Sequence, residues 1–135
     1  MDSALNLTME DAARVLDAQP FSRLLGCRIT EFRQGAATLE LPNHDDLRQQ
    51  DGFVHGGALA YLADNAITFA AGSVLGARVL TAGVSIDYLR PATGDVVATA
   101  SVVGRTGRTA VCTAILVSRG STCAVAHGSA RLIER

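Results

Sequence analysis

The sequence predicts an α+β fold in which an antiparallel sheet wraps around one long central helix. Two observations carry this prediction. The stretch at about 56–75 is apolar at nearly every position, and four runs with strand-like alternation follow it in direct succession. A helix that is apolar on all sides has to be buried. Consecutive strands joined by short turns pair in an antiparallel way, and wrapping their sheet around the helix is the simplest way to bury it.

The remaining elements follow from local patterns. A short amphipathic helix is expected at about 8–19, with Thr8 as its N-cap and Pro20 near its end. The polar segment PNHDDLRQQDG predicts a loop. Strands are expected at 25–32, 36–41, 79–89, 96–103, 109–117 and 122–133, with hairpin connections at RTGR and at Ser118-Arg119-Gly120-Ser121.

Composition narrows the class of protein. The 135 residues fit a single domain, 1–135, and the content is 48% hydrophobic and 19% charged. A net charge of −1 without clustered basic residues disfavours nucleic-acid binding. The low fraction of charged residues also indicates that partner subunits cover part of the surface.

The same reasoning bears on location and metals. The N-terminus shows no secretory pattern, and polar residues interrupt the apolar run enough to favour a buried helix over a membrane span. Three cysteines without CxxC spacing favour a reducing compartment over disulfides or zinc. We therefore expect a cytoplasmic protein with no metal, no cofactor and no membrane partner.

Asp64 is the most informative residue, because it lies in the middle of the apolar stretch. Burying an ionised carboxylate is costly unless another group pairs with it or chemistry requires it. Asp64 lies nine residues after His55, which is the first residue of a His55-Gly56-Gly57 motif. Helix N-termini present unpaired N–H groups, and glycines let a substrate carbonyl approach them. The pattern therefore indicates an acid or base working with an oxyanion-binding amide.

The combination of motifs resembles one family. His-Gly-Gly, the acid nine residues later, the long apolar helix, the strand GVSIDYLRP and a Gly94-Asp95 turn are similar to the hotdog-fold acyl-CoA thioesterases. The likeness is to the subgroup of phenylacetate-degradation (PaaI-like) and hydroxybenzoyl-CoA thioesterases, and it covers roughly residues 20–133. It implies hydrolysis of acyl-CoA to a carboxylate and CoA by a homodimer or a homotetramer built from dimers.

The resemblance also implies roles for individual residues. Asp64 matches the general base or nucleophile, the Gly56 amide matches the oxyanion donor, and the acid and this amide come from different subunits. Gln49 and His55 match positioning groups on the same subunit as Gly56, and Thr68 matches an assisting hydroxyl. Substrate contacts are expected from Gly57, Ser85, Arg90, Arg105, Arg108, Phe53 and Tyr61.

Simpler readings remain open at this stage. Asp64 can be a structural carboxylate, His55 a helix cap, and Thr68 a hydroxyl bonded to its own helix. The turn arginines can be merely solvated. A non-catalytic acyl-CoA-binding or sensing module and a hotdog dehydratase or hydratase are the alternative functions. The acyl group itself cannot be deduced from the residues.

Overall fold

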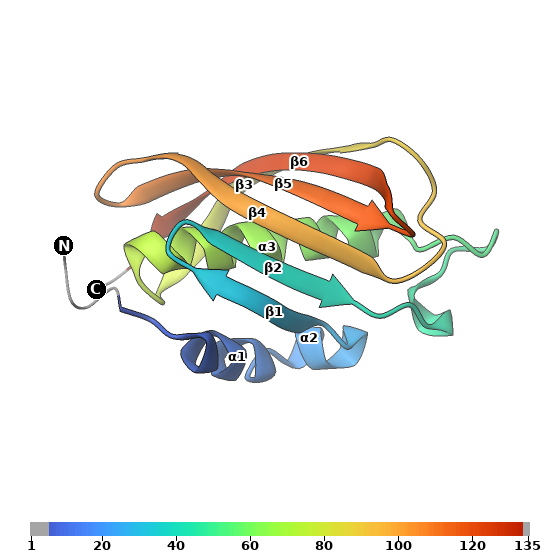
Figure 1. Cartoon of the computed structure of the whole chain (residues 1–135), viewed down its shortest axis with the longest axis horizontal. Coiled ribbons are helices and arrows are strands. Elements are labelled where there is room, and N and C mark those ends of the chain that lie inside the picture. Colours follow the sequence, from blue (N-terminus) through green and yellow to red (C-terminus); the bar gives the residue numbers. More distant parts are fainter. Residues whose placement is uncertain (1–5, 134–135) are drawn as a thin grey trace.

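A computed structural model describes residues 6–133, and within that range six strands form one antiparallel sheet around a long helix, α3 (Figure 1). The strand order is β1-β2-β4-β5-β6-β3. The strands are β1 (Arg28–Arg33), β2 (Ala36–Leu41), β3 (Val79–Tyr88), β4 (Val96–Arg105), β5 (Thr109–Ser118) and β6 (Ser121–Leu132). The helices are α1 (Met9–Asp17), α2 (Pro20–Leu25), the 3₁₀ turn η2 (Asp45–Leu47) and α3 (Gly56–Leu75). The predicted fold class is confirmed.

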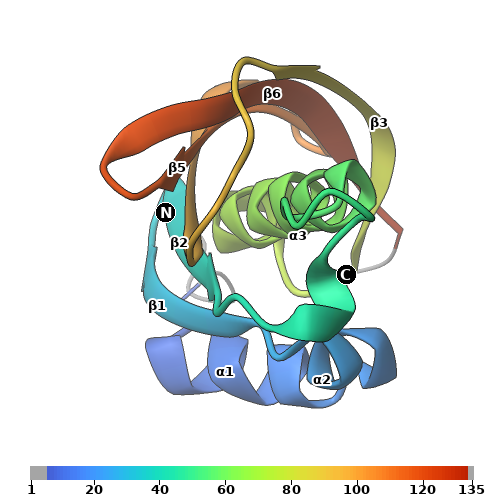
Figure 2. The same ribbon diagram turned by 90° about the vertical axis from the view of Figure 1, so that its right-hand side faces the viewer.

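The central helix has the bounds that the apolar stretch predicts. Small residues make its burial possible, because the inner faces of β4, β5 and β6 carry alanines that are almost fully buried and let the helix approach the sheet closely. Helix α3 is long and apolar enough to cross a membrane, yet 78% of its most apolar 18-residue stretch is buried inside the fold. It is the core helix of a globular domain, as Figure 2 shows end-on.

Two details of the predicted order are wrong. The segment from Pro20 to Leu25 is helical, so the first strand begins at Arg28 and not at Leu25. Proline suits the first position of a helix, and Gly26 ends α2 with a φ of 81°, a left-handed conformation that favours glycine. In the sequence, Pro20 indicated only the end of the preceding helix.

The second correction concerns β3. Succession along the chain predicted that β3 pairs with β4, but β3 pairs with β6 and forms one edge of the sheet. The connection after β3 therefore crosses over the sheet. Its consequence is functional, because an edge strand is left open beside α3, and most of β3 is exposed.

The N-terminal helices cover the open side of α3 beneath β1 (Figures 1 and 2). Helix α1 begins with a capping box in which the Thr8 hydroxyl accepts from the Asp11 amide and the Asp11 carboxylate accepts from the Thr8 amide. Its buried residues Ala12 and Leu16 join the core. This cap is the one that the sequence predicts.

Candidate active site

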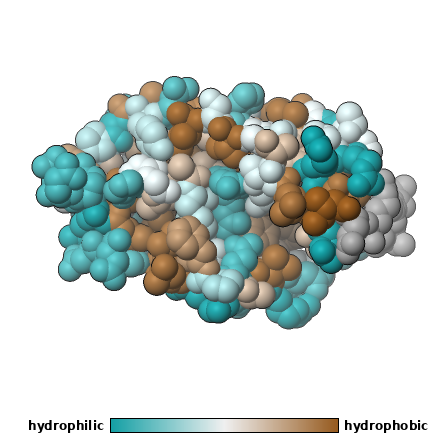
Figure 3. Space-filling model, turned by 180° about the vertical axis from the view of Figure 1, so that it is seen from behind, coloured by the Kyte–Doolittle hydropathy of each residue, from teal (hydrophilic) through white to brown (hydrophobic). Residues whose placement is uncertain are grey.

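Asp64 is half-buried in the middle of α3, and its carboxylate accepts a hydrogen bond from the hydroxyl of Thr81. Thr81 lies on the edge strand β3 and pairs with Ala130 of β6, a buried residue of the inner face. The carboxylate therefore lies at the open edge of the sheet. Seen from behind, this side of the molecule carries apolar patches between polar residues (Figure 3); Leu80, Val84 and Tyr88 of β3 are among the exposed apolar residues.

The N-terminus of α3 presents one free amide. The ring Nδ1 of His55 accepts from the Gly57 amide at 2.8 Å, and the His55 carbonyl accepts from the amides of Ala58 and Leu59. In residues 6–133 the Gly56 N–H has no hydrogen-bond acceptor. His55 is therefore a helix cap, and its capping leaves the Gly56 amide available to a ligand.

Tyr88 holds this helix end against β3. Its hydroxyl donates to the Gly56 carbonyl oxygen at 2.9 Å, and its ring lies 3.4 Å from the position that a Gly56 side chain would take. The contact fixes the Gly56–Gly57 peptide at the start of α3, whereas the free Gly56 N–H belongs to the preceding peptide and takes no part in it. Glycine at this position keeps the approach to the amide unobstructed.

Asp64 and Gly56 cannot act on the same carbonyl within one chain. They are eight residues apart on one helix, which separates them by about 12 Å along the axis. A carbonyl oxygen held by an amide has to lie within about 3 Å of it. If both groups serve one reaction, the amide has to come from a second copy of the chain.

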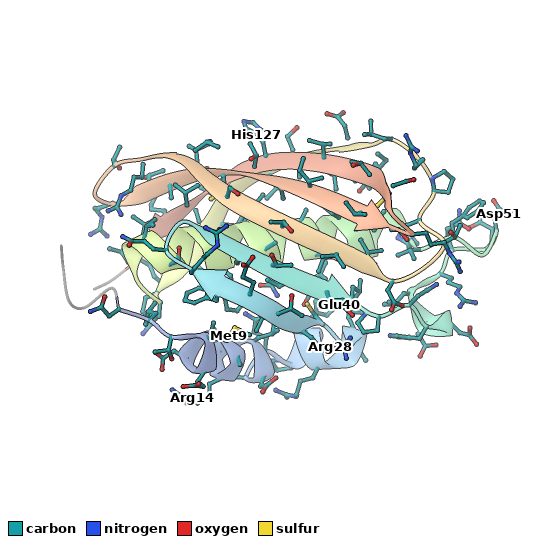
Figure 4. All side chains as sticks on the ribbon, in the orientation of Figure 1. Met9, Arg14, Arg28, Glu40, Asp51 and His127 are labelled. Atoms are coloured by element: carbon teal, nitrogen blue, oxygen red, sulfur yellow. The ribbon has the colours of Figure 1, made fainter. Side chains whose placement is uncertain are left out.

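Gln49 lies in the loop before α3, near Asp51, which Figure 4 labels at the far end of the molecule. Its main-chain amide donates to the Phe53 carbonyl at 2.8 Å, and its side-chain oxygen Oε1 accepts from the Asp51 amide. Because Oε1 is occupied, the Nε2 group remains to donate to a ligand. Phe53 is half-buried and closes this short loop through its backbone.

The Thr68 hydroxyl donates to the Asn65 carbonyl at 2.9 Å, so its proton serves its own helix backbone. The hydroxyl that donates to Asp64 belongs instead to Thr81, which the sequence analysis did not single out. Thr68 lies one helical turn from Asp64 and is half-buried, and its oxygen can still accept from a water or a substrate group.

A polar cluster joins α2 to α3, made of Gln19, Ser22, Tyr61 and Asn65. The Asn65 side-chain amide donates to Gln19 at 3.2 Å and to the Tyr61 hydroxyl at 3.1 Å, and the hydroxyls of Ser22 and Tyr61 lie 2.6 Å apart. Burial raises the pKa of the Tyr61 phenol far above its ordinary value, so the group stays neutral. Tyr61, expected as a substrate contact, has its hydroxyl committed to this cluster.

Ser85 points to the other side of the sheet. It pairs with His127 of β6, which pairs in turn with Thr113 of β5, and the buried residues of both strands alternate with these positions. Figure 4 shows His127 on the outer surface of the sheet. Within one chain the structure therefore does not bring Ser85 together with Asp64.

The three arginines that were expected to contact the substrate, Arg90, Arg105 and Arg108, lie at opposite ends of the sheet. Arg105 donates to the Val74 carbonyl at 2.8 Å, and Arg108 donates to the Leu132 carbonyl at 2.9 Å, so both bind main-chain oxygens near the C-terminal end of α3. Arg90 follows β3 beside the N-terminal end, where its amide donates to the Cys123 carbonyl at 3.3 Å. No single chain gathers them around one phosphate.

Thr81, Tyr88 and the Asn65 side chain are the site residues that the sequence analysis missed. Tyr88 stands in the quoted GVSIDYLRP motif, and Asn65 is the polar neighbour of Asp64. Those two signals were available in the sequence, whereas the contact of Thr81 depends on which strand lies beside α3.

Comparison with known proteins shows the family to which the chain belongs. The profile of a family described as "Domain of unknown function (DUF4442)" matches residues 12–132. The chain belongs to this family. Over 111 residues it is 37% identical to a protein of Halobacterium salinarum named "Putative esterase VNG_1336C", covering 74% of this chain and 73% of that protein.

Solved structures give the superfamily. A thioesterase family protein from Silicibacter pomeroyi superposes with a TM-score of 0.84 at 28% identity, covering 91% of this chain and 96% of that one. The E. coli PaaI protein from the phenylacetic acid degradation operon superposes with a TM-score of 0.85 at 25% identity, covering 93% and 92%. This DUF4442 protein is thus a hotdog-fold member of the thioesterase superfamily, and its relatives support thioester hydrolase activity in general.

Proposed function

We propose that this protein hydrolyses acyl-CoA thioesters to a free carboxylate and CoA. The observation that carries the proposal is the pairing of a free Gly56 amide at the start of α3 with the Asp64 carboxylate in the middle of the same helix. Thioester hydrolysis needs a donor for the developing oxyanion and a carboxylate that attacks or activates water. Both are present, and both lie toward the open β3 edge.

The active unit is a homodimer, or a tetramer built from such dimers, in which each site takes Asp64 from one chain and Gly56 from the other. The distance between the two residues along α3 supports this arrangement, and so does the exposed edge strand β3, which offers unpaired backbone groups to a second copy. A two-fold interface would create two identical sites.

In the reaction, the carbonyl oxygen of the thioester accepts a hydrogen bond from the partner's Gly56 amide. Asp64 removes a proton from water as the water oxygen bonds to the carbonyl carbon, and the tetrahedral intermediate then expels CoA thiolate, which takes up a proton. In the alternative route the Asp64 oxygen attacks the carbonyl carbon directly, the C–S bond breaks and CoA leaves as a thiolate that takes up a proton, and water then hydrolyses the resulting anhydride to the free acid and Asp64. The Thr81 hydroxyl orients the carboxylate, while Gln49 Nε2 adds a second donor.

His55 acts by capping α3, which directs the Gly56 amide outward. Thr68 serves as an acceptor for the attacking water. Gly57, Ser85, Phe53, Tyr61, Arg90, Arg105 and Arg108 stay predicted substrate contacts, and for Ser85 and the arginines these contacts require a second chain. The cytoplasm is the proposed location.

The test is release of free thiol from acyl-CoA by the purified protein and by Asp64→Asn. We expect Asp64→Asn to lose hydrolysis and Asp87→Asn to keep it, since Asp87 pairs with Val125 on the outer face of β3. Near-normal hydrolysis by Asp64→Asn would remove the carboxylate from the mechanism. Acyl-CoA binding without turnover by the unmodified protein would instead favour a sensing module.

Solvent-oxygen labelling in a single turnover separates the two routes. Direct attack by Asp64 places solvent oxygen in the carboxylate when the anhydride is hydrolysed at that end. Water activation places it only in the released acid.

A further inference from the structure

A cavity of about 500 Å³ lies between α1, β1 and the C-terminal half of α3, and of the residues that line it the proposed reaction uses only Thr68. Its volume falls in the range of about 300–1,000 Å³ that is typical of small-molecule sites. Its lining is largely apolar: Leu7, Ala12, Val15, Phe32, Phe69 and Val79. Phe32 and Phe69 are packed against each other in this lining, with their rings edge to face and their centroids 6.5 Å apart.

Two elements lead from the catalytic carboxylate into this cavity. Thr68 lines it and lies one turn of α3 beyond Asp64, a rise of about 6 Å. Val79 also lines it and lies two residues before Thr81 on the same face of β3, a distance of about 7 Å. Because Thr81 donates to Asp64, the helix and the strand both place the mouth of the cavity one step from the reacting group.

We propose that this cavity holds the acyl group of the substrate and selects neutral, apolar acyl chains of medium length. The inference rests on the proposed function and names its substrate class. The carbonyl carbon of a thioester carries the acyl chain and the sulfur of CoA as separate substituents. When this carbon is held at Asp64, the acyl chain and the CoA therefore extend in different directions. The cavity is a largely apolar space whose lining begins at Thr68, one helical turn from Asp64, so burial of a hydrocarbon chain there is favourable.

The two charged side chains in the lining of the cavity, Asp11 and Arg14, pair with each other. Arg14 is held by Asp11 in an ion pair at 2.5 Å on the exposed surface of α1, where Figure 4 shows it. A carboxylate at the end of an acyl chain would have to compete with Asp11 for this guanidinium. Gln19 offers only a neutral donor, since its side-chain oxygen is bound by Ser22 and Asn65 and its Nε2 is the group left to donate. An uncharged chain therefore fits this rim better than a dicarboxylic one.

Gly72 provides the decisive variant, because it lines the cavity without a side chain. A Cβ added there would meet only Val79 Cγ2, at 3.8 Å, which is an ordinary contact. Gly72→Ala should therefore be accommodated and should favour the helix. Gly72→Leu places a branched side chain in the cavity and should shorten the space for an acyl chain.

The experiment compares octanoyl-CoA with acetyl-CoA for the unmodified protein, Gly72→Leu and Gly72→Ala. For Gly72→Leu we expect kcat/KM for octanoyl-CoA to fall about tenfold or more, since pocket contacts of this size discriminate on that scale. Its kcat/KM for acetyl-CoA should change little, and Gly72→Ala, which fills less of the cavity, should lower kcat/KM for octanoyl-CoA much less than Gly72→Leu does. Val15→Trp, on the 41% exposed Val15 of α1, narrows the cavity from the other wall and serves if Gly72→Leu does not fold.

An equal loss for both substrates in a folded variant, or no loss for either, would overturn the cavity assignment while leaving hydrolysis intact. If the unmodified protein hydrolyses neither octanoyl-CoA nor acetyl-CoA, the proposed function fails. The cavity is then tested by binding alone. Equilibrium binding to Asp64→Asn should favour octanoyl-CoA over acetyl-CoA, and adding Gly72→Leu should abolish that preference. Absence of any preference would overturn the assignment in that case as well.

Discussion

The hydroxyl of Thr81 on β3 donates a hydrogen bond to the carboxylate of Asp64 on α3. This bond ties the reacting group to the edge strand and occupies one carboxylate oxygen in a fixed direction. It makes Thr81 a positioning residue for the proposed reaction, and its effect is measurable separately from folding.

Thr81→Val removes the hydroxyl but keeps the shape of the side chain. Hydrogen bonds to charged groups contribute about 1.5–3 kcal/mol, so we expect kcat to fall about 10- to 100-fold. KM should change less, because Thr81 is proposed to contact Asp64 and not the substrate. Steady-state kinetics check this, and Thr81→Ser should restore most of kcat. An unchanged kcat for Thr81→Val would show that the bond has no catalytic role.

Gly56→Pro deletes the proposed oxyanion donor with little change to the backbone. Gly56 is the first residue of α3, where proline is well tolerated, and His55 already has the extended conformation, φ −61° and ψ 137°, that precedes proline. We expect turnover to fall about 10²- to 10³-fold. Gly56→Ala keeps the N–H and should therefore retain far more activity than Gly56→Pro. Equal activity of the two variants would remove the amide from the mechanism.

Mixing two inactive variants tests the shared site. A dimer of one Asp64→Asn chain and one Gly56→Pro chain has one site with both defects and one site with neither. Co-expression should therefore recover activity that neither variant has alone. Failure to recover it, with heterodimers demonstrated by mass, would mean that each chain carries a complete site.

The order of the central helix and the hairpins was predictable because their signals are local. The apolar run of α3, the Thr8 cap and the turn at Arg119-Gly120 each depend on neighbouring residues. The position of β3 was not predictable in this way, because pairing with β6 instead of β4 is a choice between distant partners.

The residues of the candidate site divide in the same way, into those recognisable from the local sequence and those whose contacts depend on the fold. Asp64 and His55-Gly56 were found from residue type and spacing. The sequence could not tell which hydroxyl meets Asp64, since the contact of Thr81 requires β3 to lie at the sheet edge beside α3. Nor could it tell that His55 would bind the Gly57 amide and leave that of Gly56 free, because this depends on how the ring is turned.

Asn65→Leu should destabilise the fold through the polar cluster between α2 and α3. Asn65 is 8% exposed and bonds Gln19, Ser22 and Tyr61, so its replacement removes these hydrogen bonds and places an apolar side chain against buried polar groups. The expected decrease in the free energy of unfolding is about 1–3 kcal/mol. Urea unfolding measures it, and Gln50→Ala in the exposed loop is the control that should change little. Equal stability of both variants would show that the cluster contributes nothing.

Alkaline pH should weaken the fold through Cys112. Burial raises the pKa of this thiol from 9.0 to about 11, so the folded state holds a proton that the unfolded state releases earlier. The resulting stability is present below pH 9 and is lost as the pH rises toward 11. We expect the unfolding free energy to decline over this interval, and to decline less in Cys112→Ala. Parallel pH profiles of the two proteins would contradict the assignment.

Gly128→Ala should displace the strand that holds Thr81. A Cβ at Gly128 on β6 would overlap the Gly83 carbonyl oxygen and lie 3.1 Å from Val84 Cα, both main-chain atoms of β3 that cannot turn aside as a side chain could. Overpacking of this kind costs about 1–3 kcal/mol. The matched control is Gly104→Ala on β4, where an added Cβ meets nothing within 4 Å. We expect Gly128→Ala to lower both the melting temperature and hydrolysis, since moving β3 moves the partner of Asp64 and the edge proposed for dimerisation. A Gly128→Ala protein as stable and as active as Gly104→Ala would mean that β3 can shift without disturbing the site.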